Sequence, residues 1–408
     1  MQNSKLSEHR WDRAGSAVVD DTAFVSHEYL ESSQAALESA YGGRLRQLEG
    51  ERRSRLTGFL AEHDLDQLVI FGSAAPGQRS AIRFATNYSP SGRQVCAVVG
   101  RDGRITLGVV YSAHFAWALH VTWADHVVLI TSVQDISGEV ERLASPGARI
   151  GVARLDVLDH LVATDLITWL TDRFGTVTDV TDDLASLVLV KSPLEIQLVQ
   201  MTGALAGRAL DEAAVIVEPG MSERELVGAT SSTLWAGGAE TVNLLVGSGG
   251  GLARPQALPR RFAADDGIQL SVEIAGPGGY WVQAVRTYQL GAGLPGLAAL
   301  IDTAERAEQT LQAQLRAGEP IRRLAEFGLP TDSTDAVPLW HGMGLEMGEP
   351  PYYLTPGDGP WRPGMVVAIH PNLFRPPAGC FLGNTYIVTD GDPICSTAPN
   401  APEAGHNA

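Results

Sequence analysis

Two strand-like segments joined by a glycine-rich turn constrain the second half of this chain most strongly. Residues 270–288 read LSVEIAGPGGYWVQAVRTY, a pattern that predicts a long β-hairpin. Two later segments read WHGMGLEMGEPP (340–351) and PGMVVAIHP (363–371), and helical patterns lie before and between them. Glycines and prolines punctuate each turn, so the order of elements predicts an α+β domain with a strongly bent antiparallel sheet.

The first half follows another pattern, in which strands alternate with helices. Leu48, Leu56 and Phe59 recur at helical spacing after Leu45, and the apolar run QLVIFG then predicts a buried strand. Further strands are predicted at QVCAVVG, ITLGVVY and HVVLITS, and helices at VQDISGEVERLA and VLDHLVATDLITWLTDRF. This alternation is typical of a self-contained α/β domain.

A helix-start signal marks the boundary between the two halves. Ser192 is suited to the N-cap, Pro193 to the first helical position and Glu195 to the first turn, so a long helix is predicted to begin there. We therefore expect a domain boundary near Lys191. The predicted division is an extension (1–45), an α/β domain (46–190), an α+β domain (191–398) and a tail (399–408).

Composition excludes several kinds of partner. The formal net charge is -17 and no run of Lys and Arg occurs, which argues against binding to nucleic acid. No apolar stretch is long enough to predict a membrane span, and the N-terminus lacks an apolar leader. The three cysteines have no metal-ligand spacing and suit a reducing compartment. We expect a cytoplasmic protein with neither nucleic acid nor a membrane as a partner.

Five motifs occur in the order found in one known family. They are VKSPLEI, the hairpin ending in Arg286-Thr287, HGMGL, PGM before a strand, and TYIVTDG. In these the chain resembles the creatinase, prolidase and aminopeptidase P family of pita-bread enzymes, and most of all creatinase and ectoine hydrolase. The resemblance implies a creatinase-like α/β N-terminal domain, an α+β pita-bread C-terminal domain and a homodimer.

The resemblance also implies where the metal ligands of the metallopeptidases should stand, and most of them are replaced. One bridging Asp corresponds to Gln283, and the other to Glu273 or, with a different turn length, to Val272. His341 is retained, whereas the two Glu ligands correspond to His370 and to Gly383, next to Asn384. Bridging carboxylates are needed to neutralise two cations at close range. We therefore expect no dinuclear metal site and no cofactor.

Glu273, His341 and His370 are the predicted catalytic residues, because a carboxyl and two imidazoles supply a general base and a general acid. Creatinase and ectoine hydrolase imply a metal-independent hydrolase that cleaves a C–N bond, amide or amidine, in a small amino-acid-like molecule. Two alternatives stay open. The same three side chains suit a mononuclear iron(II) or zinc site, or a lyase. Alternatively, the domain binds a ligand or protein without catalysis, as pita-bread relatives among histone chaperones do.

Further residues are candidates for substrate binding. Arg93 resembles the arginine that binds a substrate carboxylate in creatinase. Gln256 occupies the position of one substrate-facing histidine of the family, and Glu349 follows Gly348, which occupies the other. Arg286 is expected mainly to support the site through charge-assisted hydrogen bonds. The predicted substrate-binding set is Arg93, Gln283, Gln256, Tyr352, Asn384, Glu349 and Arg286.

Overall fold

The computed structural model describes residues 27–92, 94–130, 133–144, 147–327, 334–335 and 339–398. The chain divides into two compact units, residues 1–187 and 188–408. The sequence prediction puts this boundary near Lys191. The predicted tail (399–408) and residues 1–26 of the predicted extension lie outside the described residues.

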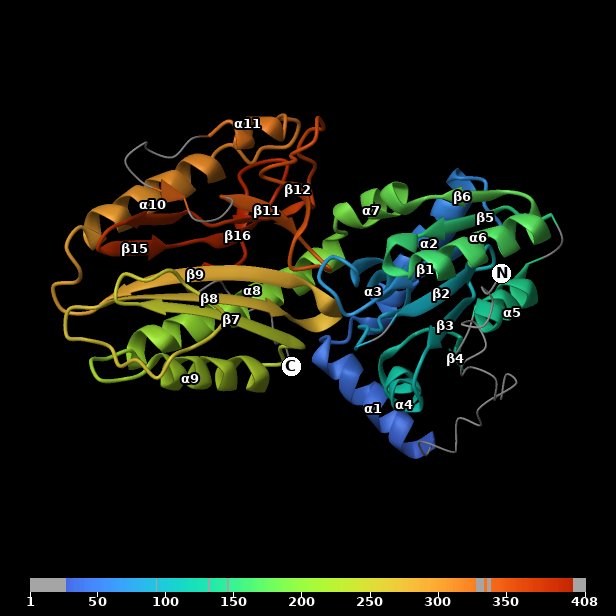
Figure 1. Cartoon of the computed structure of the whole chain (residues 1–408), viewed down its shortest axis with the longest axis horizontal. Helices are drawn as coiled ribbons and strands as arrows, with labels where there is room; N and C mark the ends of the chain where they lie inside the picture. Colours follow the sequence, from blue (N-terminus) through green and yellow to red (C-terminus); the bar gives the residue numbers. More distant parts are fainter. Residues whose placement is uncertain are drawn as a thin grey trace, which may run out of the picture. The chain divides into compact units, whose positions relative to one another are not determined.

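The first unit is built around a six-stranded mixed sheet in the order β4-β3-β2-β1-β5-β6 (Figure 1). Pairs β1–β2 and β2–β3 are antiparallel, and the remaining pairs are parallel. The strands are β1 (Gln67–Gly72), β2 (Val95–Gly100), β3 (Ile105–Val109), β4 (His126–Leu129), β5 (Ile150–Ala153) and β6 (Val177–Asp179). The α/β fold class predicted for this half is confirmed.

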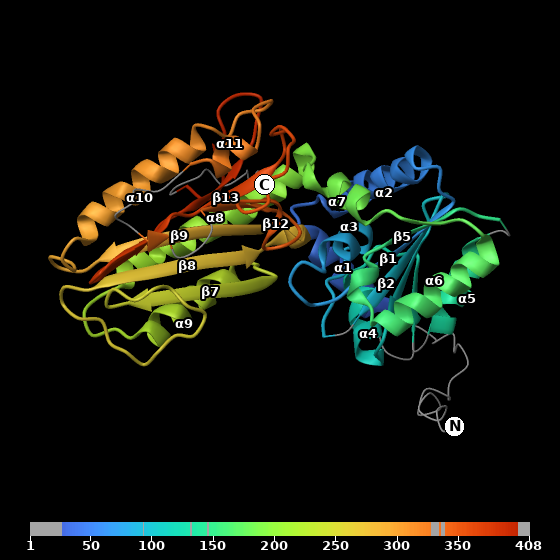
Figure 2. The same ribbon diagram turned by 45° about the horizontal axis from the view of Figure 1, so that its top comes forward.

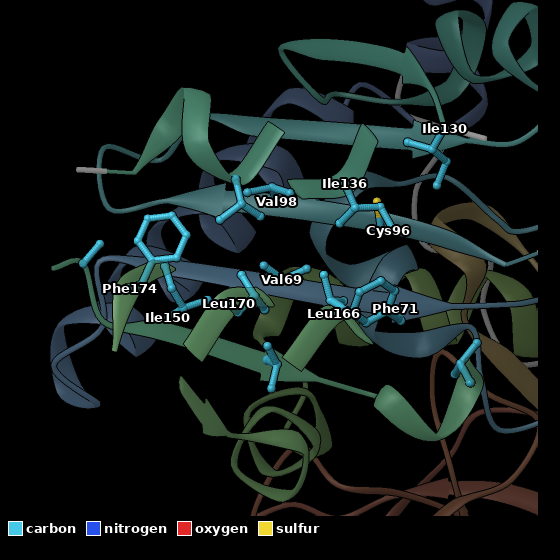
Figure 3. Close-up of a cluster of buried hydrophobic side chains, with 14 residues drawn as sticks. Val69, Phe71, Cys96, Val98, Ile130, Ile136, Ile150, Leu166, Leu170 and Phe174 are labelled. Carbon is cyan, nitrogen blue, oxygen red and sulfur yellow. The ribbon is translucent and has the colours of Figure 1, made fainter. Parts of the chain in front are cut away.

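Helices cover this sheet and close its core. The central strands β1 and β2 are buried at every residue, which requires packing on both faces. Figure 3 shows Leu166, Leu170 and Phe174 of α6 lying against Val69 and Ile150 of the sheet. The helices of this unit are α1 (His27–Ala40), α2 (Leu45–Glu62), α3 (Ser80–Thr86), α4 (Ser112–Val121), α5 (Val133–Leu143), α6 (His160–Phe174) and α7 (Thr181–Leu189), whose last two residues belong to the second unit.

The helix predicted after Ser192 is present as α8 (Pro193–Ile216). The Ser192 side chain accepts a hydrogen bond from the Glu195 amide, and the Glu195 carboxylate accepts one from the Ser192 amide. This reciprocal capping box satisfies two backbone donors that the first helical turn leaves unpaired. The sequence signal for the start of the helix is confirmed.

The second unit stacks its sheets between helices, and its α+β class is also as predicted (Figure 2). Helix α8 packs on β8 and β9, and α9 (Glu223–Ala236) packs on β7. Helix α10 (Leu297–Gln312) packs on β13, β14 and β15, while α11 (Arg322–Ala325) is a single turn. One sheet has the strand order β7 (Thr241–Ser248), β8 (Gly267–Ala275) and β9 (Trp281–Gln289). A second sheet has the order β12 (Glu349–Tyr352), β11 (Trp340–Met343), β13 (Val366–Ile369), β16 (Asn384–Ile387) and β17 (Ile394–Cys395). A third has the order β10 (Thr334–Asp335), β14 (Asn372–Arg375) and β15 (Ala378–Phe381).

Strand β8 positions the site because it is buried along its whole length and polar on one face. Successive strand residues point to opposite faces, so Gln269, Ser271 and Glu273 share the face opposite to Leu270 and Val272. Burying three polar side chains in a central strand is costly unless each is hydrogen-bonded. The polar face of β8 is therefore where hydrogen-bond partners are to be expected.

No single helix in the described part of the chain is long and apolar enough to cross a membrane. Helices α7 and α8 reach that length and composition only when taken together, and the chain bends between them.

Candidate active site

A cavity of about 490 Å³ opens within the second unit. Its size falls in the range of small-molecule sites, which are commonly about 300–1,000 Å³. It brings together residues from β8, β9, β11, β12 and the turns beside them. The lining residues are Glu273, Gln283, Trp340, His341, Met347, Gly348, Tyr352, Tyr353, Leu354 and Thr355.

A hydrogen-bonded carboxyl group forms one wall of the cavity. Glu273 stands directly opposite Asn243 on β7 and Gln283 on β9, so the three side chains form a row across the sheet. The Asn243 amide donates to Glu273 Oε2 at 2.5 Å, and the Gln283 amide donates to Oε1 at 3.1 Å. The Ser271 hydroxyl donates to Oε1 at 3.3 Å. Burial raises the pKa of Glu273 above its usual value, although the Asn243 and Ser271 bonds act in the opposite direction.

The register also decides between the two positions that the resemblance leaves open. Glu273 pairs with Gln283, whereas Val272 pairs with Ala284 and lies on the other face of the sheet. Glu273 and Gln283 are thus the two side chains that face the cavity together.

His341 on β11 supplies an imidazole to the same cavity. Its Nδ1 lies 2.9 Å from the carbonyl oxygen of Gly342, which can only accept a hydrogen bond. The ring therefore donates from Nδ1, and Nε2 keeps its lone pair. Burial lowers the pKa of His341 below its usual value, and the Gly342 bond offsets this only in part. His341 is suited to accept a proton.

His370 lies behind His341 and does not line the cavity. The two ring centroids are 4.9 Å apart, and the ring planes are tilted by 58°. Both ring nitrogens of His370 are buried, and neither has a hydrogen-bond partner among the described residues. Burial, with a smaller contribution from His341, lowers the pKa of His370 to about 3. His370 is therefore neutral near pH 7 and packs against His341, which lines the cavity.

Arg286 and Asn384 were predicted to bind substrate, but the structure gives their polar groups to protein partners, outside the cavity. The Arg286 guanidinium donates to the carbonyls of Val285 and Gly383 and, at 3.0 Å, to Asn384 Oδ1. The Asn384 amide donates to Glu308 at 2.8 Å. This network joins β9, β16 and α10, in line with the supporting role expected for Arg286.

Glu308 was missed by the sequence reasoning. It accepts hydrogen bonds from Asn384 and from the Tyr386 hydroxyl at 2.9 Å, and burial raises its pKa. The sequence offers one weak signal: Glu308 follows the buried Ala304 and Ala307 on the inner side of α10.

Of the other predicted substrate-binding residues, some line the cavity and some do not. Tyr352 lines the cavity, and its hydroxyl donates to the Gly348 carbonyl at 2.9 Å. Glu349 is instead buried in an ion pair with Lys191 at 2.8 Å and does not line the cavity. Gln256 is exposed in a loop and also does not line it. Arg93 lies outside the described residues.

Asn243 and Ser271 are further site residues that the sequence reasoning missed. Asn243 reaches Glu273 only through the pairing of β7 with β8, a strand pair that the sequence analysis did not predict. Ser271 is two residues from Glu273, so the polar alternation within β8 was an available signal.

Comparison with known families accounts for both units. The family of the creatinase/prolidase N-terminal domain matches residues 52–185, and metallopeptidase family M24 matches residues 197–390. The chain combines a creatinase/prolidase N-terminal domain with an M24 domain. The domain pair that the sequence motifs imply is confirmed, whereas a special closeness to ectoine hydrolase stays a prediction.

Similar proteins have been described as peptidases. The chain is 28% identical over 222 residues to proteins named probable dipeptidase PepE from Mycobacterium bovis and Mycobacterium tuberculosis, a match that spans 52% of this chain and 59% of theirs. Among solved structures, an X-Pro aminopeptidase from Thermotoga maritima matches with a TM-score of 0.73 at 18% identity, over 85% of this chain and 97% of that one. Dipeptidase PepE from Mycobacterium ulcerans matches with a TM-score of 0.67 at 21% identity, over 86% and 96%. At these identities the solved structures show a shared fold.

The side chains of this M24 domain do not fit a pair of metal ions. The Gln283 amide is a donor to Glu273, which leaves one carboxyl group on the cavity wall. Gly383 offers no side chain, and a Cβ atom there would lie 2.4 Å from the Ile369 carbonyl oxygen and 2.7 Å from His370 Cα. Across the described ranges, no three or more His, Cys, Asp or Glu side chains are grouped so that they could hold a metal ion. The mononuclear set of Glu273, His341 and His370 is likewise not assembled.

Proposed function

We propose that this protein is a hydrolase that cleaves a C–N bond in a small molecule, with His341 as general base and Glu273 as general acid. One observation carries the proposal. A carboxyl with a raised pKa and an imidazole with a lowered pKa line the same cavity. These opposite shifts favour the protonated carboxyl and the neutral imidazole, the forms that an acid and a base require.

The reaction follows from these two forms. The Nε2 lone pair of His341 takes a proton from water as the water oxygen attacks the carbonyl carbon of the substrate. The resulting tetrahedral species collapses when Glu273 gives its proton to the departing nitrogen, and the C–N bond breaks. The proton held by His341 then returns to the Glu273 carboxylate through solvent, leaving an acid and an amine as products.

The neighbouring residues hold these two groups in place. Asn243, Ser271 and Gln283 fix the Glu273 carboxyl by hydrogen bonds, so that it faces the cavity in one orientation. His370 packs its ring on His341. We therefore assign His370 a positioning role, in place of the direct catalytic role that the sequence suggests.

The curated relatives support C–N hydrolysis as the reaction type, since they are called probable dipeptidases. The match to the curated dipeptidases spans 59% of their length, so the substrate is part of this proposal. The replacement of the family's metal ligands by Gln283, His370 and Gly383 supports a reaction that does not use a pair of metal ions.

The test is hydrolysis by the full-length protein before and after treatment with EDTA, with bound metals measured by mass spectrometry. We expect cleavage of small amides to survive metal removal. His341→Asn and Glu273→Gln should each lower kcat/KM at least about a hundred-fold, the usual contribution of a general acid or base. The matched controls His160→Asn and Glu218→Gln, at exposed positions, should leave activity unchanged. Loss of activity with EDTA and its recovery with Mn²⁺, Co²⁺ or Zn²⁺ would contradict the proposal.

A further inference from the structure

Lys191 and Arg286, two basic side chains of the second unit, are engaged by protein partners. Lys191 donates to the Glu349 carboxylate at 2.8 Å and to the Leu189 carbonyl, and its side chain is 1% exposed. Arg286 donates to Val285, Gly383 and Asn384. No Lys or Arg of the described residues lines the cavity. A substrate carboxylate would therefore lose its hydration there without gaining a cation, which is strongly unfavourable.

Glu273, the carboxyl group on the cavity wall, does not favour a cationic ligand either. Glu273 receives three hydrogen bonds from neutral donors, Asn243, Ser271 and Gln283. Burial raises the pKa of Glu273 despite these bonds and so favours the uncharged carboxyl that the proposed reaction uses, which gives a cationic ligand no counterion. The lack of a Lys or Arg side chain in the described lining and the hydrogen-bonded carboxyl of Glu273 both favour an uncharged ligand.

Much of the remaining lining is apolar, and Gly348 leaves an open position in it. The apolar and aromatic lining residues include Trp340, Met347, Tyr352 and Leu354. A Cβ atom on Gly348 would lie 3.6 Å from Tyr352 Cε1 and 4.0 Å from His341 Nδ1, which are ordinary contact distances. The missing side chain thus leaves a space between the base and an aromatic ring.

We infer that the cavity takes an uncharged amide whose aromatic or bulky apolar group lies over Gly348, between His341 and Tyr352. This inference rests on the proposed function, because it assumes that the cavity is the site of reaction. Gly348 then determines specificity: its lack of a side chain admits a group that a large side chain would exclude. Apolar contact with Trp340, Met347 and Leu354 supplies affinity, and the amide is left facing His341 and Glu273.

Three small probes separate charge from size, with binding to the full-length protein measured by calorimetry. Phenylacetamide is the neutral aromatic amide, phenylacetate has nearly the same shape with a negative charge, and acetamide lacks the ring. We expect phenylacetamide to bind at least about ten-fold more tightly than either of the others, a difference of about 1.4 kcal/mol. Equal or tighter binding of phenylacetate, or no binding of any probe, would overturn the inference.

Substitution at Gly348 tests the place of the ring. Gly348→Leu should weaken phenylacetamide binding at least about ten-fold, since its side chain would occupy the space beside Tyr352. Gly348→Ala should have a smaller effect in the same direction. The control Gly228→Leu should bind like the wild type, because Gly228 is exposed on α9 and a Cβ atom there would have no neighbour within 4 Å. Unchanged binding by Gly348→Leu would place the ring elsewhere and overturn the inference.

Binding and turnover distinguish this inference from the proposed function. If phenylacetamide binds as expected but neither it nor other small amides are hydrolysed, the ligand class stands and the proposed hydrolase does not. If zwitterionic dipeptides are hydrolysed while phenylacetamide fails to bind, the hydrolase stands and the inferred ligand class is wrong.

Discussion

Gln283 and Glu273 lie directly opposite each other on β9 and β8, and the Gln283 side-chain amide donates to the Glu273 carboxyl at 3.1 Å. The resemblance to M24 metallopeptidases implies two bridging carboxylates at these positions. Two carboxylates so close repel each other unless a cation or a shared proton lies between them, whereas an amide and a carboxyl satisfy each other. Gln283 and Glu273 therefore satisfy each other's polar groups without a metal ion between them.

Restoring a second carboxylate should consequently destabilise the protein. We expect Gln283→Glu to lower the free energy of unfolding by about 1–3 kcal/mol at about pH 8, through lost hydrogen bonding and repulsion from Glu273. The two acids raise each other's pKa in the folded state, so the loss should shrink as the pH falls and the pair takes up a proton. Urea unfolding at several pH values measures the effect. Gln289→Glu, at the exposed end of β9, is the matched control. Equal stability of Gln283→Glu and wild type at high pH would argue against the contact.

The pH dependence of activity should reflect the two shifted groups. Turnover requires neutral His341 and protonated Glu273. The acid limb of kcat/KM should therefore lie below the ordinary imidazole pKa of 6.5, and the alkaline limb above the ordinary carboxyl pKa of 4.5. The expected profile is a bell whose limbs report the macroscopic values of the pair. Glu273→Gln should remove the alkaline limb, together with most of the activity. A profile that rises through pH 7 to a plateau would contradict these roles.

Gly383 and Gly348 should differ sharply in their tolerance of alanine. A Cβ on Gly383 would clash with the backbone of Ile369 and His370, which cannot move without disturbing β13, whereas a Cβ on Gly348 meets only ordinary contacts. We expect Gly383→Ala to cost about 1–3 kcal/mol of unfolding free energy, as overpacked core sites do, and Gly348→Ala to stay within about 0.5 kcal/mol. Thermal unfolding of the two variants measures the difference. Similar melting temperatures for both would show that the chain adjusts around residue 383.

The sequence predicted the fold and part of the site, and the division has a physical basis. The β8–β9 hairpin and the start of α8 depend on local patterns, namely strand periodicity around a glycine turn and the capping box at Ser192. Glu273, Gln283, His341 and Tyr352 were named from the resemblance, and all four line one cavity. Strand register and side-chain partners depend on tertiary packing, which is why Asn243 and Glu308 were missed. For the same reason, Glu349 and Asn384 were assigned to substrate although protein partners hold them.

His370 should make the protein sensitive to acid. Its folded-state pKa of about 3 lies far below the ordinary value of 6.5, so the unfolded chain binds a proton between these values and the folded protein does not. Stability is therefore greatest above about pH 6.5 and is lost as the pH falls toward about 3, by up to several kcal/mol.

Replacing His370 with a residue that cannot be protonated should remove this loss. His370→Phe keeps an aromatic ring beside His341 and Phe381 and leaves no polar atom without a partner, so its unfolding free energy should fall less steeply between about pH 6.5 and pH 4 than that of the wild type. His160→Phe, at an exposed position on α6, controls for loss of a histidine as such. Chemical unfolding across this pH range, followed by circular dichroism, gives both slopes. Parallel slopes for His370→Phe and wild type would show that His370 is protonated in the folded protein, with a hydrogen-bond partner such as bound water that stabilises its charge.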